Sequence, residues 1–443
     1  MELVPISVHL PGAPLPDALP SGAIFDSMTQ TLRWIPARGQ VGEVSVTFQI
    51  AGQPHIISFR IEPIADAVLK EGPLDLYDDG DLGMIFIHGR VDADLCANRT
   101  ALWDYWDGGV DGVDPVGGDR TLACYDGRAR VDVVAVQVAQ QIVAARCGHF
   151  NRCVAVTHSM GGLILEYILT HARPAPAGED DPSLFAHHAL FTEAKARLLF
   201  SIAIASAAGG SKVAAMVVEP SNFPDATRVV GEIASIFGAV TGATTSLVPE
   251  RAAQLAPLDV DPGLPIFMVA GFSDEIIITD SSLVGNWWEM LTSDDGEDYF
   301  NGDTGYASLD MLAAFSSRSD GIVAFRSACG IASASINDGP GRRASLEEQA
   351  AYCMEAPKKP QHYVWLAANQ NHSHIATMGR DCSRIGCRIY RASPDGKLEH
   401  DSFFDGLGVM STIRWLLTTS RPAHDLQATD VAVDLFSGSV TPR

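Results

Sequence analysis

The sequence lacks any run of about 18 consecutive apolar residues, the length that a membrane-spanning helix needs. Basic residues are also few, with 31 Lys and Arg against 54 Asp and Glu, which gives a formal net charge of −23 at pH 7. A charge of this sign disfavours nucleic acid and anionic membrane surfaces as main partners. We therefore expect no transmembrane segment and no nucleic-acid partner.

The first residues, Met1 to Pro5, lack the basic and apolar regions of a secretory signal. The eight cysteines nonetheless favour an oxidising compartment, because none of them has the Cys-x-x-Cys spacing of a zinc site. We expect a secreted, periplasmic or cell-surface protein whose signal has been removed; a cytosolic protein with buried free thiols is the alternative. Among about 105 possible connectivities, four disulfide pairs are plausible: Cys96/Cys124, Cys147/Cys153, Cys329/Cys353 and Cys382/Cys387.

Residues 1–65 are predicted to form a small β module. The runs Val44–Ile50 and Ile56–Ile61 alternate as strands do, and Gly52 and Pro54 mark a turn between them. The module resembles the immunoglobulin-like, cadherin-like modules of bacterial surface proteins, which implies a β-sandwich that acts as a spacer or packing partner. The resemblance rests on this series: Leu19-Pro20, Gly22, Phe25-Asp26, Thr31-Leu32, Trp34, Pro36 and Gln40-Val41-Gly42.

A linker at 66–80 is expected to lead into a larger domain at 81–420, followed by a C-terminal tail at 421–443 in which no element is clear from the sequence. Apolar runs in the larger domain are predicted strands at 84–87, 154–158, 199–205, 266–270 and 362–368. Helical spacing is found between these strands, at 96–106, 131–145, 186–198 and, after the last strand, at 406–417. This alternation predicts the α/β class, with a mostly parallel sheet covered on both faces.

One stretch of this domain, residues 154–168, indicates a nucleophile. An apolar run leads into a tight turn with Ser159 at its apex, and apolar residues then recur at helical spacing. A serine on a sharp turn between strand and helix is how an α/β-hydrolase holds its nucleophile. Thr157 stands where the usual Gly-x-Ser-x-Gly pattern has its first glycine. His158, beside the serine, is expected to be structural.

A serine needs a base within hydrogen-bond reach and an acid that orients the base. His372 directly follows the last predicted strand and is the preferred base, with His374 as the alternative. The preferred acid is Asp320, at a turn before an apolar run, and Asp274, just after an earlier strand, is the alternative.

The oxyanion of an acyl-transfer intermediate needs backbone N–H donors. We expect these from Met160, just after the nucleophile, and from Arg90, in the loop after a strand that ends at His88-Gly89. His88 itself is expected to form structural hydrogen bonds.

Taken in order, these segments resemble the bacterial triacylglycerol lipases, from about Gly83 to Leu417. The resemblance implies an α/β-hydrolase fold with a helical lid and a serine ester hydrolase activity. It rests on four segments: His88-Gly89, His158 to Gly162, Asp320-Gly321-Ile322-Val323 and Asn371-His372.

The same resemblance implies a lid insertion at about 213–250, centred on the apolar segment 226–247; a buried core helix is the alternative. No cofactor is expected for the chemistry. The lipase group often binds a structural calcium ion two residues after the catalytic histidine, a position that is His374 here. The acidic run 294–298 could hold calcium instead, or it could be a solvated loop.

The predicted substrate is a hydrophobic acyl ester, at a lipid or polymer surface. Polyester depolymerisation, phospholipid deacylation and acyl transfer would use the same residues and stay open. A surface-binding module built on an inactive hydrolase is the alternative outside enzymes.

Overall fold

The structure is a computed structural model. It describes residues 6–10, 19–20, 23–26, 30–34, 42–50, 53–61, 83–106, 109–110, 120–147, 153–179, 181–222, 240–257, 260–264, 266–272, 323, 325–328, 362–368, 372, 374–376, 388–392, 398–400, 409–410, 413, 431–433 and 440–442.

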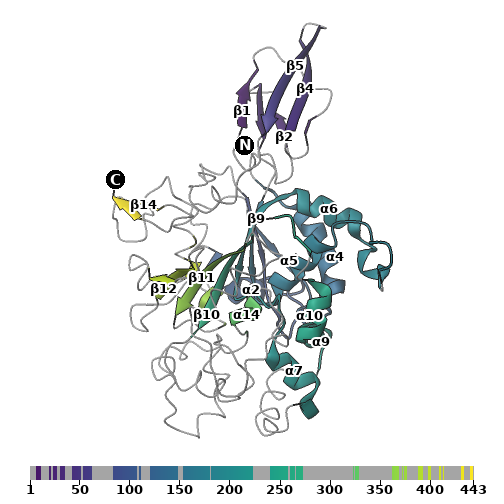
Figure 1. Cartoon of the computed structure of the whole chain (residues 1–443), viewed down its shortest axis with the longest axis vertical. Coiled ribbons are helices and arrows are strands. Elements are labelled where there is room, and N and C mark those ends of the chain that lie inside the picture. Colours follow the sequence, from purple (N-terminus) through teal and green to yellow (C-terminus); the bar gives the residue numbers. More distant parts are fainter. Residues whose placement is uncertain are drawn as a thin grey trace.

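A sheet with the strand order β13-β12-β11-β10-β9-β8-β6-β7 forms the centre of the larger domain (Figure 1). The strands from β7 to β11 in this order run parallel, and β12 and β13 continue the sheet antiparallel. Their bounds are β6 Gly83–Ile87, β7 Arg120–Ala123, β8 Cys153–His158, β9 Leu198–Ile204, β10 Ile266–Phe272, β11 His362–Ala368, β12 Arg388–Ala392 and β13 Leu398–His400.

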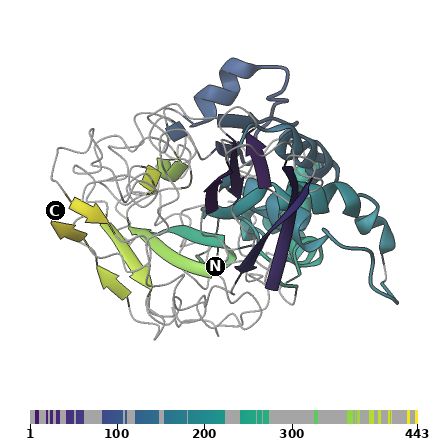
Figure 2. The ribbon, with the colours of Figure 1, turned by 90° about the horizontal axis from the view of Figure 1, so that it is seen from above.

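Every residue of β6, β8 and β9 is buried, as parallel strands covered on both faces must be. The helices α4, α5 and α6 pack against one another, and the edge-to-face rings of Phe200 and Phe267 join β9 to β10. Viewed from above, the helices drawn in teal gather at one side of the molecule and the yellow-green strands at the other (Figure 2). The described helices are α2 Arg99–Trp106, α4 Val131–Ala144, α5 Met160–Thr170, α6 His188–Ala196, α7 Lys212–Val218, α9 Gly242–Ser246, α10 Pro249–Leu255 and α14 Phe325–Ala328.

The turn with Ser159 follows β8, a strand in the middle of this sheet, and leads directly into α5. The larger domain has the α/β-hydrolase fold. The five strands predicted from apolar runs are confirmed, with bounds that differ by at most two residues. Strands β7, β12 and β13 were not predicted, because each is short and carries polar or charged residues.

Two small sheets form the N-terminal part. One has the order β1-β3-β2, with β1 Ile6–His9, β2 Ala23–Asp26 and β3 Thr31–Trp34; the other pairs β4 Gly42–Ile50 with β5 Gln53–Ile61. They share a core of Phe25, Leu32, Val46 and Phe48. Pro54 lies within β5, opposite Gln49, so its assignment to the turn was wrong. The immunoglobulin-like identity of this part stays a prediction.

The C-terminal tail contains two short antiparallel strands, β14 Val431–Val433 and β15 Val440–Pro442. The sequence shows no clear element there, because three-residue strands are too short to give a periodic pattern. Of the helix predicted at 406–417, only residues 409, 410 and 413 are described, and all three are helical.

The two ends of the expected lid insertion belong to the core. Residues 213–217 of α7 are buried, and Ala243, Leu247 and Ala252 join the same hydrophobic cluster as the central sheet. The N–H of Val131, at the start of α4, also donates to Ser246 Oγ at 3.1 Å. Residues 223–239 lie outside the described ranges, and the prediction of a lid now rests on them alone.

Within the described part of the chain, no helix is long and apolar enough to cross a membrane.

Replacing Phe267 by Ala should lower the free energy of unfolding by about 3–5 kcal/mol, because the ring is 2 % exposed and its loss leaves a cavity beside Phe200. Urea unfolding followed by tryptophan fluorescence measures the change. Val133→Ala, at a position on α4 that is 55 % exposed, is the matched control and should change stability by less than about 0.5 kcal/mol. Equal midpoints for the two variants would contradict the assigned core.

Candidate active site

Ser159 lies at the turn between β8 and α5 with φ 55°, a conformation that residues other than glycine rarely adopt. Its N–H donates to Ile204 O at 3.1 Å, at the end of β9. Its carbonyl oxygen accepts from the N–H groups of Gly162 and Ala207, both at 3.0 Å. These bonds fix a strained backbone that costs on the order of 1–3 kcal/mol, and they hold the serine at the carboxyl edge of the sheet.

Two glycines allow this turn, because neighbouring atoms come too close to them for any side chain. A Cβ on Gly161 would lie 2.6 Å from His88 O, and a Cβ on Gly162 would lie 2.7 Å from Ser206 Cβ. Thr157, in place of the first glycine of the usual pattern, is fully buried, and its hydroxyl has no partner among the described residues. The turn accommodates this threonine because the tightest contacts fall after the serine.

His372 approaches the serine from the loop after β11. Its Nε2 lies 2.8 Å from Ser159 Oγ, and the side chain is 8 % exposed. Of the alternative, His374, only the backbone is described, in the short 3-10 helix His374–Ala376. The structure therefore brings together the serine and the preferred base.

Both candidate acids, Asp320 and Asp274, lie outside the described residues. The chain shortly after Asp320 is described, however. Val323 is buried in the main hydrophobic core, and Ser327 O accepts the N–H of Gly209 at 3.1 Å, in the segment after β9. The choice between the two aspartates stays a prediction.

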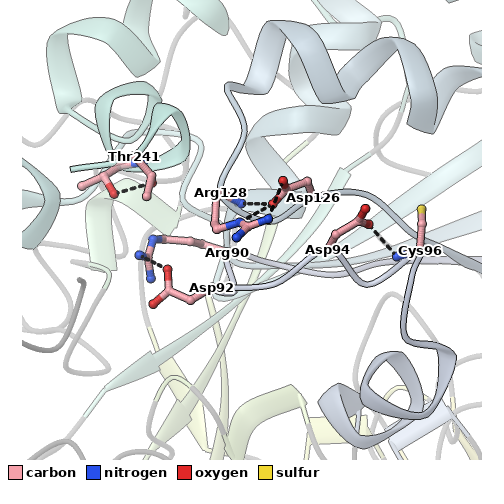
Figure 3. Close-up of polar contacts among 8 residues, drawn as sticks. Arg90, Asp92, Asp94, Cys96, Asp126, Arg128 and Thr241 are labelled. Atoms are coloured by element: carbon pink, nitrogen blue, oxygen red, sulfur yellow. Dashed lines mark hydrogen bonds and ion pairs between the residues drawn. The ribbon is translucent and has the colours of Figure 1, made fainter. Parts of the chain in front are cut away.

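The loop after β6 passes directly beside Ser159. A Cβ on Gly89 would lie 2.6 Å from Ser159 Cβ and 3.1 Å from its Oγ, so only glycine fits there. The next residue, Arg90, donates from its guanidinium to Asp92 at 2.7 Å (Figure 3). The backbone of this loop, with the N–H of Met160 at the start of α5, borders the serine where the sequence predicts the oxyanion donors.

A second loop, after β7, is joined to the Gly89 loop by hydrogen bonds and a disulfide. The N–H of Leu95 donates to Tyr125 O at 3.2 Å, and that of Gly127 donates to Ala93 O at 3.0 Å. A disulfide joins Cys96 to Cys124 directly beside this pairing. Figure 3 shows the two loops running side by side, with the Arg128 guanidinium on the Asp126 carboxylate. Ala93, Leu95 and Cys96 of the first loop are thus linked to the second loop by backbone hydrogen bonds and a disulfide.

Two of the four predicted disulfides are confirmed, Cys96–Cys124 and Cys147–Cys153. The other two pairs involve Cys329, Cys353, Cys382 and Cys387, which lie outside the described ranges.

His88, before the glycine, is fully buried and stacks on Tyr125, with ring centroids 3.8 Å apart. Burial lowers the pKa of His88 to about 4, so the ring is neutral at pH 7. Its Nδ1 lies 2.7 Å from Gly89 O, a carbonyl that can only accept, and therefore carries the proton. The Tyr125 hydroxyl donates to the carbonyl of His88 itself. These contacts shape the loop.

His158 contacts the loops on both sides of the serine. Its Nε2 lies 2.7 Å from His372 O, and its Nδ1 lies 2.5 Å from the hydroxyl of Tyr105, on α2. The same hydroxyl accepts the N–H of Gly89 at 2.7 Å. Sequence reasoning missed Tyr105. The only signal was its place in an aromatic group, Trp103-Asp104-Tyr105-Trp106, soon after the loop.

Within the described ranges, no group of three or more His, Cys, Asp or Glu side chains is arranged to hold a metal ion. The acidic run 294–298 lies outside those ranges, and the side chain of His374 is not described. Calcium binding stays a prediction.

No protein-family model and no curated protein matches this sequence. Among solved structures, the mature lipase BlEst2 of Bacillus licheniformis is 15 % identical, over 57 % of this chain and 80 % of that one, with a TM-score of 0.36. EstA of Clostridium botulinum is 12 % identical over 71 % and 88 %, and the lipase of Staphylococcus hyicus is 12 % identical over 67 % and 89 %, each with a TM-score of 0.38. These likenesses are remote, and the strand order of the chain itself identifies the fold.

Replacing Cys96 and Cys124 together by Ser should speed amide exchange in the Gly89 loop, because the covalent link beside the Leu95–Tyr125 pairing is lost. Hydrogen–deuterium exchange of peptides covering 88–96 and 124–128 measures this. The control is Cys147→Ser with Cys153→Ser, at the start of β8 and therefore at the edge of the sheet away from Ser159. Equal exchange in both double variants would show that the disulfide does not hold the loop.

Proposed function

We propose that this protein is a serine hydrolase of carboxylic esters that works through an acyl-enzyme. One observation carries the proposal: Ser159 Oγ lies 2.8 Å from His372 Nε2, on a turn where the serine has φ 55°. A strained, nearly buried serine in contact with an imidazole is an activated nucleophile. A surface-binding module built on an inactive hydrolase would not need this contact between serine and histidine.

The chemistry follows from the placement of the groups. Ser159 attacks the ester carbonyl and passes its hydroxyl proton to His372 Nε2, and the tetrahedral oxyanion accepts from the N–H groups of Met160 and Arg90. The carbonyl then re-forms, the C–O bond to the alcohol breaks, and His372 returns the proton to the leaving alcohol. Water, deprotonated by His372, attacks the acyl carbon; the bond between Ser159 Oγ and the acyl group then breaks, His372 returns the proton to Ser159, and the acid leaves. Asp320 would orient the imidazole and stabilise its charged form.

The proposed substrate is a hydrophobic acyl ester, presented at a lipid or polymer surface outside the cell. Two confirmed disulfides support an oxidising compartment. Polyesters, phospholipids and acyl acceptors other than water remain open for the same site. Nitrophenyl esters of increasing chain length, an emulsified triglyceride and a polyester film, assayed in parallel, separate these substrates.

A fluorophosphonate probe should label the wild-type protein at a single serine, and Ser159→Ala should abolish the labelling because the activated oxygen is gone. His372→Gln should slow labelling by at least about 100-fold through loss of the base. Mass spectrometry of the labelled peptide and the labelling rate measure the two effects. The control is Ser183→Ala, an exposed serine at the start of a short 3-10 helix, which should leave labelling unchanged.

No labelling of a folded wild-type protein, or equal labelling of Ser159→Ala, would overturn the proposed function.

Asp320→Asn should reduce kcat by at least about 100-fold, because an amide cannot stabilise the imidazolium of His372. Asp274→Asn should leave kcat within about threefold. Steady-state hydrolysis of a short nitrophenyl ester by both variants measures the difference. If only Asp274→Asn abolishes turnover, the acid is Asp274.

A further inference from the structure

An unbroken chain of hydrogen bonds connects the loop on one side of Ser159 to the loop on the other. It runs from Gly89 N–H to the Tyr105 hydroxyl at 2.7 Å, and from that hydroxyl to His158 Nδ1 at 2.5 Å. It continues from His158 Nε2 to the backbone carbonyl of His372 at 2.7 Å. Gly89 precedes a proposed oxyanion donor, and His372 is the proposed base. The chain therefore joins the two loops that must be aligned for catalysis.

The direction of every bond follows from its ends. The carbonyl of His372 can only accept, so His158 Nε2 carries a proton and donates. Burial and the neighbouring His372 lower the pKa of His158 well below its usual value, which keeps the ring neutral. The unprotonated Nδ1 must then accept, so the Tyr105 hydroxyl donates to it. The oxygen of the same hydroxyl accepts the hydrogen bond from the N–H of Gly89.

The histidine of the network is buried, Tyr105 is half-buried, and other rings pack against both. His158 is 4 % exposed, and burial raises the pKa of the Tyr105 hydroxyl far above its usual range. The ring of Trp106 lies edge-on to both Tyr105 and His158, and His158 lies against His372 with ring centroids 4.8 Å apart. Buried hydrogen bonds of this kind define one arrangement, because a broken bond leaves a polar group without a partner.

We propose that Tyr105 and His158 are positioning residues, which hold the Gly89–Arg90 loop and the His372 loop in one fixed alignment around Ser159. This role rests on the proposed hydrolase function. Neither side chain takes part in a proton transfer: Tyr105 acts through Gly89, and His158 acts through the backbone of His372. The proposal also gives a reason for a histidine directly before the nucleophile, where its ring points away from Ser159 Oγ to the carbonyl of the base.

The test removes different bonds of the network in different variants. Tyr105→Phe removes both bonds of the hydroxyl. His158→Asn keeps an acceptor near the position of Nδ1 and loses the donor to His372 O, whereas His158→Gln keeps a donor near Nε2 and loses the partner of Tyr105. The matched control is Tyr167→Phe, which removes a buried tyrosine hydroxyl that donates to Leu184 O at 2.9 Å, far along α5 from the serine.

Tyr105→Phe should lower kcat for a short nitrophenyl ester by about 10–100-fold with KM within about twofold, because misplaced donors weaken only the transition state. His158→Asn and His158→Gln should each lower kcat less than His158→Ala does, since each keeps one of the two hydrogen bonds of His158. In the double variant Tyr105→Phe with His158→Asn, the fold-loss of kcat should be smaller than the product of the two single fold-losses, because both residues act through one chain of hydrogen bonds. Tyr167→Phe should lower the Tm by a similar amount to Tyr105→Phe and leave kcat unchanged.

Unchanged kcat in Tyr105→Phe, or a loss matched by Tyr167→Phe, would overturn the positioning role while the wild type still hydrolyses ester. Fully multiplicative losses in the double variant would show that the two residues act independently and would also overturn it. If the wild-type protein is folded but neither hydrolyses ester nor reacts with the fluorophosphonate, the proposed function itself is wrong. The two failures are therefore distinguishable.

Discussion

The site depends on one backbone constraint, the positive φ of Ser159 between a buried strand and a buried helix. The conformation turns the serine out of the sheet, and hydrogen bonds to Ile204 and Ala207 at the end of the neighbouring strand hold it there. It also brings α5 so close to the end of β6 that Gly161 has no room for a side chain. Strain of this kind persists only where the surrounding packing fixes it, and here the core of the whole sheet provides that packing.

The alignment of the proposed catalytic groups then depends on loops rather than strands. The parallel strands deliver the Gly89 loop, the Ser159 turn and the His372 loop to one edge of the sheet, as the fold requires. Their final positions come from links between loops: the disulfide of Cys96, the backbone pairing around Tyr125 and the polar chain through Tyr105 and His158. A rigid sheet with links between these particular loops positions the groups around Ser159 precisely. The rest of this edge of the sheet does not have to be rigid.

The sequence was sufficient for the fold and for the serine–histidine pair, because buried parallel strands are long apolar runs and the turn pattern around Ser159 is specific. Two disulfides were also predicted correctly. Strand β7 could not be predicted, since four residues with Arg120 and Thr121 among them show no apolar run. Tyr105 could not be predicted either, because its hydrogen bonds depend on how α2 docks beside Gly89, which no local pattern encodes.

Helix α5 has a consequence for the stability of the proposed site. All eleven of its residues are buried, including Glu166 and Thr170, and it is covered by α4, α6 and α10. A helix that is buried on every side gains its stability mainly from the neighbours that enclose it. The conformation of Ser159, directly before α5, depends on the same enclosure. Loosening of α4, α6 or α10 would therefore release the Ser159 turn as well, so the proposed site is only as stable as the helices around α5.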